Sequence, residues 1–302
     1  MPTKKAQPRR FVVKEDEAGI RLDRVVASRL GLPRAVVKEL FRSEDVQVDG
    51  SLVKGAARAR PGQVVEVSLP VAEEALWPEI PVLYEDEAIV VIDKPPGIPV
   101  HAAGQGRDKP TVVAILKKRG PLAGGSPERP GVVHRLDALT SGVMVLARSE
   151  EAWGKLVDQF RRRKVKKEYL ALVEGEVEPE EGEITGRLSR HPSRPWRMRV
   201  AREGKEAQTE FSVLARKAGR SLLLVQPHTG RTHQIRVHLS AIGHPVVGDP
   251  VYGKGGERLM LHAWRLGFRH PGSGKWMELV APPPAEFSDW FAEKGSTGRK
   301  GS

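Results

Sequence analysis

The chain of 302 residues contains no cysteine, and tryptophan, tyrosine and phenylalanine together make up only 5% of it. The absence of cysteine excludes disulfide bonds, thiolate zinc sites, iron–sulfur clusters and cysteine nucleophiles. It also fits a reducing compartment, in which disulfides are rare.

Long apolar runs are also missing. The N-terminal stretch MPTKKAQPRR is basic and polar and lacks the apolar core of a signal peptide. Nowhere does an apolar run reach the length that spans a bilayer. These absences predict a soluble, cytoplasmic protein with no membrane partner.

Positive charge is what the chain has in excess. Lysine and arginine number 50 against 38 aspartate and glutamate residues, a formal net charge of +12. A basic excess of this size raises the affinity and the encounter rate for polyanions such as nucleic acid. From charge alone, a solvated surface remains the alternative.

Composition divides the chain into five parts. Residues 1–18 and 292–302 are poor in apolar side chains and rich in charge, glycine or serine, so we expect tails that do not fold. Residues 19–70 are typical of a small α/β module, and residues 71–81 of an acidic linker with two prolines. Residues 82–291 form the main domain.

The 19–70 module is predicted to contain two short helices and a hairpin. Apolar residues recur at helical spacing over residues 22–30, just before Gly31, and again over residues 36–41. Asp49-Gly50, between alternating apolar residues, predicts a β-hairpin. The basic positions at which we expect RNA contacts are Arg21, Arg24, Arg34, Lys38 and Arg42.

The main domain is rich in predicted strands. A helix is expected over residues 153–160, where apolar residues have helical spacing. Because strands often follow one another without an intervening helix, we predict an α+β fold with a mixed, mostly antiparallel sheet. The predicted strands are residues 88–95, 142–149, 167–175, 209–217, 221–227 and 259–268.

The stretch GVVHRLDALTSGVMVLARS, residues 131–149, contains a single carboxylate, Asp137. A serine hydrolase would place Ser141 in a Gly-x-Ser-x-Gly elbow, which is absent. A retaining glycosidase would need two carboxylates around one bond, and no second one is marked by its surroundings. This motif therefore offers one aspartate as its candidate catalytic group, and a second carboxylate could come only from a distant part of the chain.

Residues 226–253 contain four histidines. Their spacing does not place the imidazoles on one helical face, so we expect them to cap, pack or hydrogen-bond rather than to hold a metal. A glycine-containing turn with Arg231 comes before a predicted helix whose inward residues are Ile235, Leu239 and Ile242. Arg231 is either solvated or holds a buried carboxylate with its planar guanidinium group.

Four stretches, in this order, resemble the RluA-type pseudouridine synthases: VIDKPPGIPVHAAG, GVVHRLDALTSGVMVLARS, KKEYLALVEG, and HTGRTHQIRVHL with GHPVVGDPVYG. Together these motifs extend over most of residues 82–282. The 19–70 module resembles the S4 RNA-binding domain, which precedes the catalytic domain in many bacterial members that act on large-subunit ribosomal RNA.

The resemblance implies roles for particular residues. Asp137 would be the catalytic aspartate, Tyr169 the aromatic that packs on the target uracil, and Arg231 the partner of Asp137. Arg135 would occupy the space left by the extruded base. The residues implied to bind the substrate are His134, Arg135 and Leu261.

The implied activity is isomerisation of uridine to pseudouridine in structured RNA, with bacterial 23S ribosomal RNA as the expected substrate. One carboxylate suffices, either as a nucleophile or as the base that removes the C2′ proton. The uridine must be flipped out of its stack first. No metal and no organic cofactor is implied, and we expect a monomer.

Two other functions remain open at the level of sequence. In the first, the chain would be an S4-type RNA-binding or ribosome-assembly protein whose catalytic domain has lost its activity. In the second, it would be a glycoside-type hydrolase. The second alternative would release free uracil.

Overall fold

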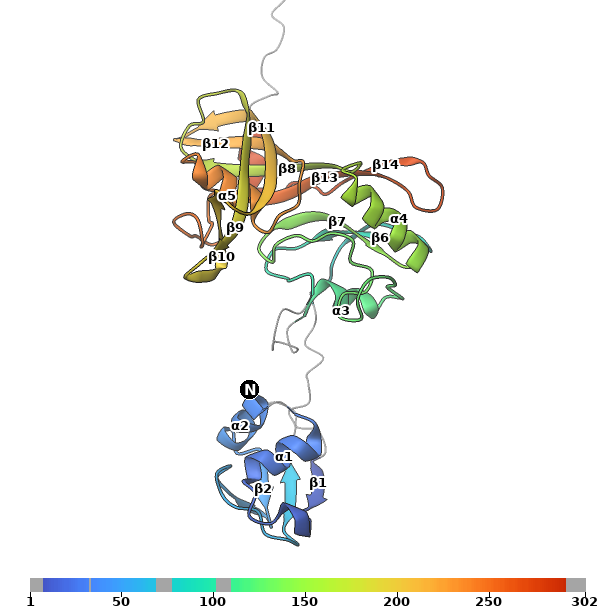
Figure 1. Cartoon of the computed structure of the whole chain (residues 1–302), viewed down its shortest axis with the longest axis vertical. Helices are drawn as coiled ribbons and strands as arrows, with labels where there is room; N and C mark the ends of the chain where they lie inside the picture. Colours follow the sequence, from blue (N-terminus) through green and yellow to red (C-terminus); the bar gives the residue numbers. More distant parts are fainter. Residues whose placement is uncertain (1–7, 33, 69–77, 102–109, 292–302) are drawn as a thin grey trace, which may run out of the picture. The chain divides into compact units, whose positions relative to one another are not determined.

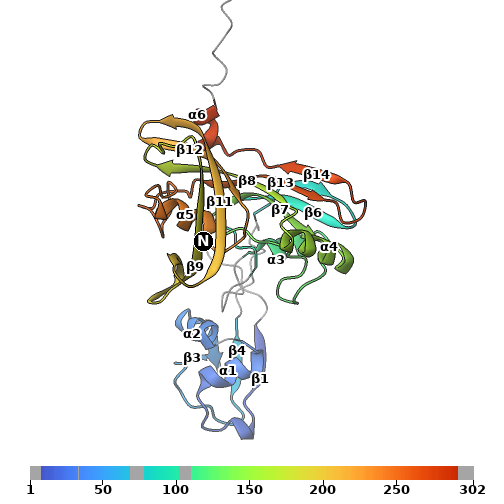
Figure 2. The same cartoon turned by 45° about the horizontal axis from the view of Figure 1, so that its top comes forward.

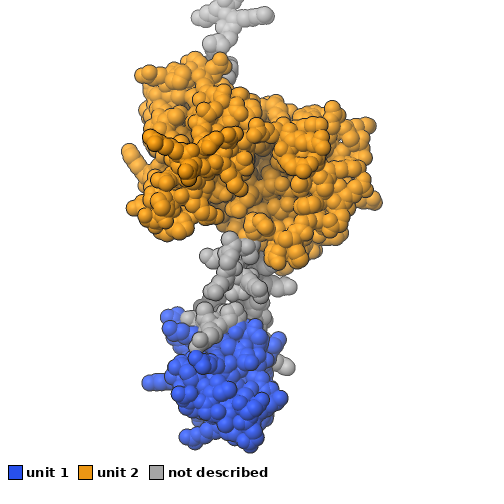
Figure 3. Space-filling model, viewed as in Figure 1, with its two compact units in different colours: residues 1–77 blue, residues 78–302 orange. Residues whose placement is uncertain are grey.

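The computed structural model describes residues 8–32, 34–68, 78–101 and 110–291, apart from the side chains of residues 34–36 and 39. The chain divides into two compact units, residues 1–77 and residues 78–302 (Figure 3). The division falls inside the predicted linker 71–81, of which residues 71–77 lie outside the described residues. The predicted tail 292–302 lies outside them as well.

The first unit is a four-stranded sheet, in the order β1-β4-β2-β3, with two helices packed on it (Figure 1). Both predicted helices are confirmed, and the first ends at Gly31 in the left-handed conformation, with φ 63°. The hairpin is confirmed too. The elements are β1 (Arg9–Val12), η1 (Glu15–Glu17), α1 (Leu22–Leu30), α2 (Arg34–Arg42), β2 (Val46–Val48), β3 (Ser51–Leu52) and β4 (Val64–Val67).

The prediction that residues 1–18 form a tail is wrong for the residues that the structure describes. Residues Arg9–Val12 form β1, which pairs antiparallel with β4, and the next residue, Val13, is only 2% exposed. The strand was missed because arginine and lysine flank a short apolar run. Its stability comes from pairing with residues more than fifty positions away, which a local pattern does not reveal.

The second unit is built on a ten-stranded sheet with the order β10-β9-β11-β12-β8-β13-β7-β6-β5, and β14 also pairs with β13. All neighbouring strands are antiparallel except β13 and β7. The predicted α+β fold with a mostly antiparallel sheet is confirmed. Its strands are β5 (Val82–Glu85), β6 (Ile89–Lys94), β7 (Ser141–Ala147), β8 (Lys166–Glu174), β9 (Glu181–His191), β10 (Arg194–Ala201), β11 (Lys205–Lys217), β12 (Arg220–Pro227), β13 (Leu261–Arg269) and β14 (Trp276–Val280).

Few helices accompany this sheet, and α4 and α5 lie on separate parts of it (Figure 2). Leu239 of α5 is fully buried in a core formed mainly with β8 and β12. Ile242, predicted to point inward, is 40% exposed, because the helix ends one residue before it. The helices are α3 (Val112–Lys117), α4 (Glu150–Arg161), α5 (Gln234–Ala241), η2 (Ala285–Phe287) and α6 (Ser288–Phe291).

The parallel pairing of β13 with β7 depends on Gly142. This glycine has φ 114°, and a Cβ atom here would collide with the backbone of Ala263 in β13. Any larger residue would push the two strands apart. The close approach therefore sets the position of the first residues of β7 against β13, only a few residues after Asp137.

Within the described residues, no helix combines the length and the apolar character needed to cross a membrane.

Candidate active site

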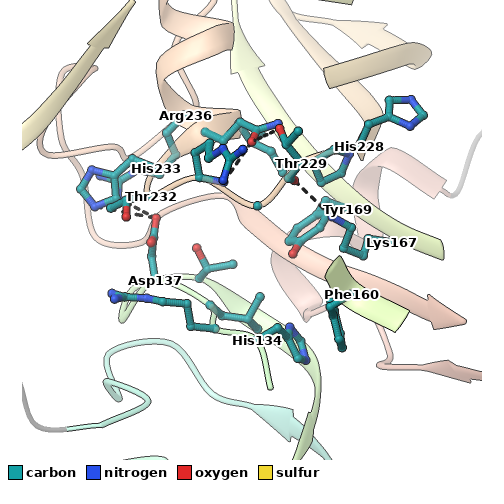
Figure 4. Close-up of a pocket in the computed structure, with 18 of the residues that line it drawn as sticks. His134, Asp137, Phe160, Lys167, Tyr169, His228, Thr229, Thr232, His233 and Arg236 are labelled. Atoms are coloured by element: carbon teal, nitrogen blue, oxygen red, sulfur yellow. Dashed lines mark hydrogen bonds and ion pairs between the residues drawn. The ribbon is translucent and has the colours of Figure 1, made fainter. Parts of the chain in front are cut away.

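A cavity of about 600 Å³ opens in the second unit, and Asp137 lies on its wall (Figure 4). Three segments supply most of the lining. They are the loop before β7, the end of α4 with the start of β8, and the turn that leads into α5. These segments are far apart in sequence, so the cavity exists only because the sheet brings them together.

Buried hydrogen bonds hold the loop that carries Asp137. The Lys94 side chain has no exposed surface, and its Nζ donates to the carbonyl oxygens of Pro95, Ile98 and Ala138, each at 2.9 Å. Burial lowers the pKa of Lys94 to about 7, although the negative charges of Asp137 and Asp93 act to raise it. Lys94 thus fixes the backbone immediately after the catalytic candidate.

Arg236 of α5 contacts the Asp137 carboxylate. Its side chain is 3% exposed, and its Nη1 donates to Asp137 Oδ2 at 3.2 Å. The rest of the guanidinium group is held by Asp249: Nε and Nη2 donate to the two carboxylate oxygens at 2.7 and 2.8 Å. One planar group therefore aligns Asp137 with a fully buried second carboxylate.

Asp249 is itself fixed by the backbone. Its Oδ1 also accepts the N–H groups of Val251 and Tyr252, at 2.8 and 3.1 Å. Burial alone would raise the pKa of Asp249, but the hydrogen bonds and charge of Arg236 outweigh it and hold this pKa below its usual value. Asp249 therefore remains ionised and keeps Arg236 in one orientation.

The predicted ion pair between Arg231 and Asp137 is corrected by the structure. Arg231 lines the cavity, but its Nε donates to the backbone oxygen of Glu206 at 3.1 Å. Arg231 precedes α5, whereas Arg236 lies inside the helix and faces the interior. The missed signal is an arginine between Ile235 and Val237, because an arginine in an apolar stretch needs a buried carboxylate partner.

Gln234 holds the turn before α5 in place. Its Oε1 accepts from the Thr229 hydroxyl and the Arg231 N–H, at 2.6 and 3.0 Å. Its Nε2 donates to Gln208 O and Thr209 Oγ1, both at 2.9 Å. The amide group is thus fully used, and it ties this turn to β11.

His233 lies between Asp137 and Tyr252. It has a left-handed backbone, with φ 56°, and directly precedes α5. Its Nδ1 is 2.9 Å from the Tyr252 hydroxyl, and its Nε2 is 3.9 Å from Asp137 Oδ2. The Tyr252 oxygen also accepts the Met198 N–H at 2.8 Å, so this hydroxyl connects His233 to β10.

The remaining histidines of this segment have separate partners, as predicted. His228 Nε2 lies 2.9 Å from a carboxylate oxygen of Glu210. His238 and His244 place their Nδ1 atoms 2.9 Å from Thr209 Oγ1 and from the Glu174 backbone oxygen. Their contacts hold β11, β8 and α5 together.

Tyr169 of β8 projects into the cavity opposite Asp137 (Figure 4). Burial, and then the charge of Asp137, raises the pKa of its hydroxyl above the ordinary value, so the ring is neutral at physiological pH. Leu261, at the start of β13, is 3% exposed and lines the same cavity. Arg135 lies at the exposed rim.

His134 forms part of the wall with Phe160. The two rings stack with centroids 4.6 Å apart and an interplanar angle of 17°. The His134 Nε2 accepts the Val145 N–H at 3.1 Å. Burial, with a smaller contribution from Lys167, lowers the pKa of His134 to about 3, so its imidazole is neutral.

Two basic residues complete the cavity on the side of β8. Lys167 Nζ donates to the Thr229 backbone oxygen at 3.1 Å, and burial followed by repulsion from Arg163 lowers the pKa of Lys167 to about 8. Arg163 also lines the cavity. A deep, partly apolar cavity with cations at its edge suits a planar base attached to a phosphate backbone.

The chain is similar to proteins named as pseudouridine synthases. A family model described as "RNA pseudouridylate synthase" matches residues 88–241, a range that includes Asp137, Tyr169 and Arg236. An "Uncharacterized RNA pseudouridine synthase" of Aquifex aeolicus is 41% identical over 293 residues, covering 90% of this chain and 93% of that protein. "Ribosomal large subunit pseudouridine synthase D" of Nitrosomonas europaea is 36% identical over 296 residues, covering 92% and 85%.

A solved structure is also similar. Human "RNA Pseudouridylate Synthase Domain Containing 1" superposes with a TM-score of 0.57 at 29% sequence identity. The superposition covers 70% of this chain and 86% of that chain.

Proposed function

Because the chain belongs to the RNA pseudouridylate synthase family and is an RNA pseudouridine synthase, we propose that Asp137 is its catalytic residue and that its substrate is large-subunit ribosomal RNA. The observation that carries the proposal is the pair of Asp137 and Arg236 in a cavity lined by Tyr169. Arg236 holds the carboxylate in one position, and Tyr169 offers an uncharged ring to the base.

The reaction needs one ionised carboxylate. The N1–C1′ bond of the uridine breaks, the uracil turns, and a C5–C1′ bond forms while the C5 proton is lost and N1 gains a proton. Asp137 serves either by bonding to the sugar or by removing its C2′ proton. In both cases the hydrogen bond from Arg236 holds the Asp137 carboxylate in position.

We propose that the cavity receives a flipped base. Extruding a uridine from folded RNA costs a few kcal/mol, which contacts inside the enzyme must offset. We assign to Tyr169 the face of the flipped uracil and to Leu261 its apolar edge. Arg135, at the rim, fills the space that the base leaves in the RNA.

The first unit is proposed to be an S4-type domain that binds the same RNA. Arg24, Lys38 and Arg42 are exposed on it, and Arg21 forms two hydrogen bonds with Asp23. The Arg34 side chain lies outside the described residues. Three relatives named "Ribosomal large subunit pseudouridine synthase D" match more than nine-tenths of this chain, which supports the choice of ribosomal RNA.

Release of tritium tests the proposal. A transcript of large-subunit ribosomal RNA, labelled with tritium at uridine C5, is incubated with the purified protein, and label in water is counted. We expect release equal to the pseudouridine found on digestion. Absence of release from ribosomal RNA would contradict the substrate assignment, and free uracil would indicate hydrolysis.

A further inference from the structure

The hairpin of β9 and β10 forms one edge of the large sheet (Figure 1). Residues 187–202, which include its tip, contain six arginines and no aspartate or glutamate. The arginines that are exposed to solvent are Arg187, Arg190, Arg194, Arg199 and Arg202. This concentration of positive charge favours the binding of a polyanion and disfavours the binding of a cationic partner.

Trp196 lies at the tip of this hairpin and is 67% exposed. Arg194 pairs with His191 across the hairpin, but the next pair joins Met198 to Arg190. Three residues of β10 therefore bulge out of the ladder, with Trp196 in the middle. Arg190 fixes the bulge, because its Nη1 donates to the Pro195 backbone oxygen at 2.8 Å.

The hairpin is joined to the active site. The Met198 N–H donates to the Tyr252 hydroxyl, which is in turn 2.9 Å from His233, the neighbour of Asp137. Arg197 of the same hairpin also contacts this tyrosine, with its guanidinium carbon 5.3 Å from the centre of the Tyr252 ring. An RNA held in the cavity thus has this hairpin as a nearby surface of the same unit.

We propose that this hairpin is a second RNA-binding surface, on which an unpaired base stacks on Trp196 while the exposed arginines contact phosphates. The inference rests on the proposed function only in taking RNA as the substrate. Every base has a face that stacks on an aromatic ring, and basic side chains around such a ring hold the backbone. A protein partner would gain one aromatic contact but would also meet the positive charge of the exposed arginines; of these, Arg187 pairs with Glu206 at 3.3 Å.

The test compares two exposed tryptophans. Trp196→Ala removes the proposed stacking surface, and Trp276→Ala, on β14, removes a side chain that is 49% exposed and outside the cavity. Binding is measured by fluorescence anisotropy with an end-labelled RNA hairpin that contains an unpaired loop. We expect Trp196→Ala to raise Kd about tenfold, as for the loss of one stacked base, and Trp276→Ala to leave Kd unchanged.

Further variants and probes separate stacking from other causes. Trp196→Phe should restore most of the affinity, and a fully paired RNA duplex should bind wild type and Trp196→Ala equally. Equal Kd values for wild type and Trp196→Ala on the looped RNA would overturn the proposal. So would a Trp196-dependent affinity for vesicles of phosphatidylglycerol that exceeds the affinity for RNA.

The binding assay stands apart from the assay of the proposed function. Anisotropy with RNA needs no turnover, so a failure of tritium release with ribosomal RNA leaves the result for Trp196 readable. Conversely, normal tritium release combined with an unchanged Kd for Trp196→Ala would reject the hairpin surface alone.

Discussion

Arg236 Nη1 lies 3.2 Å from Asp137 Oδ2, and the same guanidinium group is held from its other side by Asp249. The Asp137 carboxylate is therefore positioned by a guanidinium group whose own orientation is fixed by Asp249. The bidentate contact with Asp249 sets the plane of the guanidinium group.

Arg236→Lys should lower kcat/KM by about 100-fold. Lysine keeps the positive charge but supplies no planar fork, so it cannot hold Asp249 and orient Asp137 together, and a displacement of about 1 Å has this cost. The matched control is Arg231→Lys, which alters a side chain that donates to the Glu206 backbone oxygen and should change the rate less than threefold. Tritium release measures both variants, and a larger decrease for Arg231→Lys would reverse the assignment.

Asp249→Asn should reduce both activity and stability. The buried guanidinium of Arg236 loses a charged acceptor, and an imperfectly satisfied buried donor costs about 1–3 kcal/mol. Urea denaturation measures the free energy of unfolding. The control is Glu286→Gln, which removes a half-exposed ion pair with Arg258 and should cost less than about 1 kcal/mol. Equal decreases for the two variants would show that the contact of Asp249 with Arg236 stabilises the fold no more than the half-exposed ion pair does.

Asp137→Asn should abolish pseudouridine formation and leave RNA binding intact. Asparagine has nearly the same volume, but it is neither a carboxylate nucleophile nor a base toward C2′. Affinity is expected to come mainly from phosphate contacts and stacking elsewhere. Tritium release and anisotropy on the same preparation separate the two properties. Undiminished release would end the case for Asp137 as the catalytic residue.

Acidification should destabilise the protein through His134. Its pKa is lowered to about 3 in the folded state by burial and then by Lys167, against about 6.5 when unfolded. Below pH 6.5 the unfolded chain binds a proton that the folded chain does not, so stability present above this pH is lost as the pH falls toward 3. Between pH 6.5 and pH 4.5 the decrease due to this group is about 2 kcal/mol.

His134→Phe identifies the histidine's share of this decrease. Phenylalanine can still stack on Phe160 but does not titrate, so the decrease in unfolding free energy between pH 6.5 and pH 4.5 should be smaller in the variant. Denaturation curves at the two pH values give the comparison. Equal decreases in wild type and variant would place the acid sensitivity in other groups, such as buried His262, whose pKa burial lowers to about 4.

The double variant Arg24→Glu, Lys38→Glu should weaken RNA binding and flatten its dependence on salt. Both residues are exposed in the first unit, and removing one phosphate–cation interaction reduces the slope of log K against log salt by about 0.7–0.9. Filter binding to a large-subunit ribosomal RNA transcript over a range of salt concentrations gives the slope. An unchanged slope would mean that this surface of the first unit does not bind RNA.

The sequence by itself determined the local elements and the motif residues. Helical spacing before Gly31, the Asp49-Gly50 turn and the alternation of the main strands are local properties, and the structure contains the corresponding elements. Asp137, Tyr169 and Leu261 lie on one cavity. Each was named from a short motif, whose residues remain adjacent whatever the rest of the chain does.

Only the tertiary structure decided which arginine meets Asp137. Arg231 and Arg236 are close together in one motif, and spacing alone does not say which of them faces the interior. Which arginine faces the interior depends on where α5 begins and on Asp249, which the fold brings into contact with Arg236. Likewise β1 exists because it pairs with β4. Burial and pairing between distant segments are properties of the folded chain, so they decided the contacts that local sequence left open.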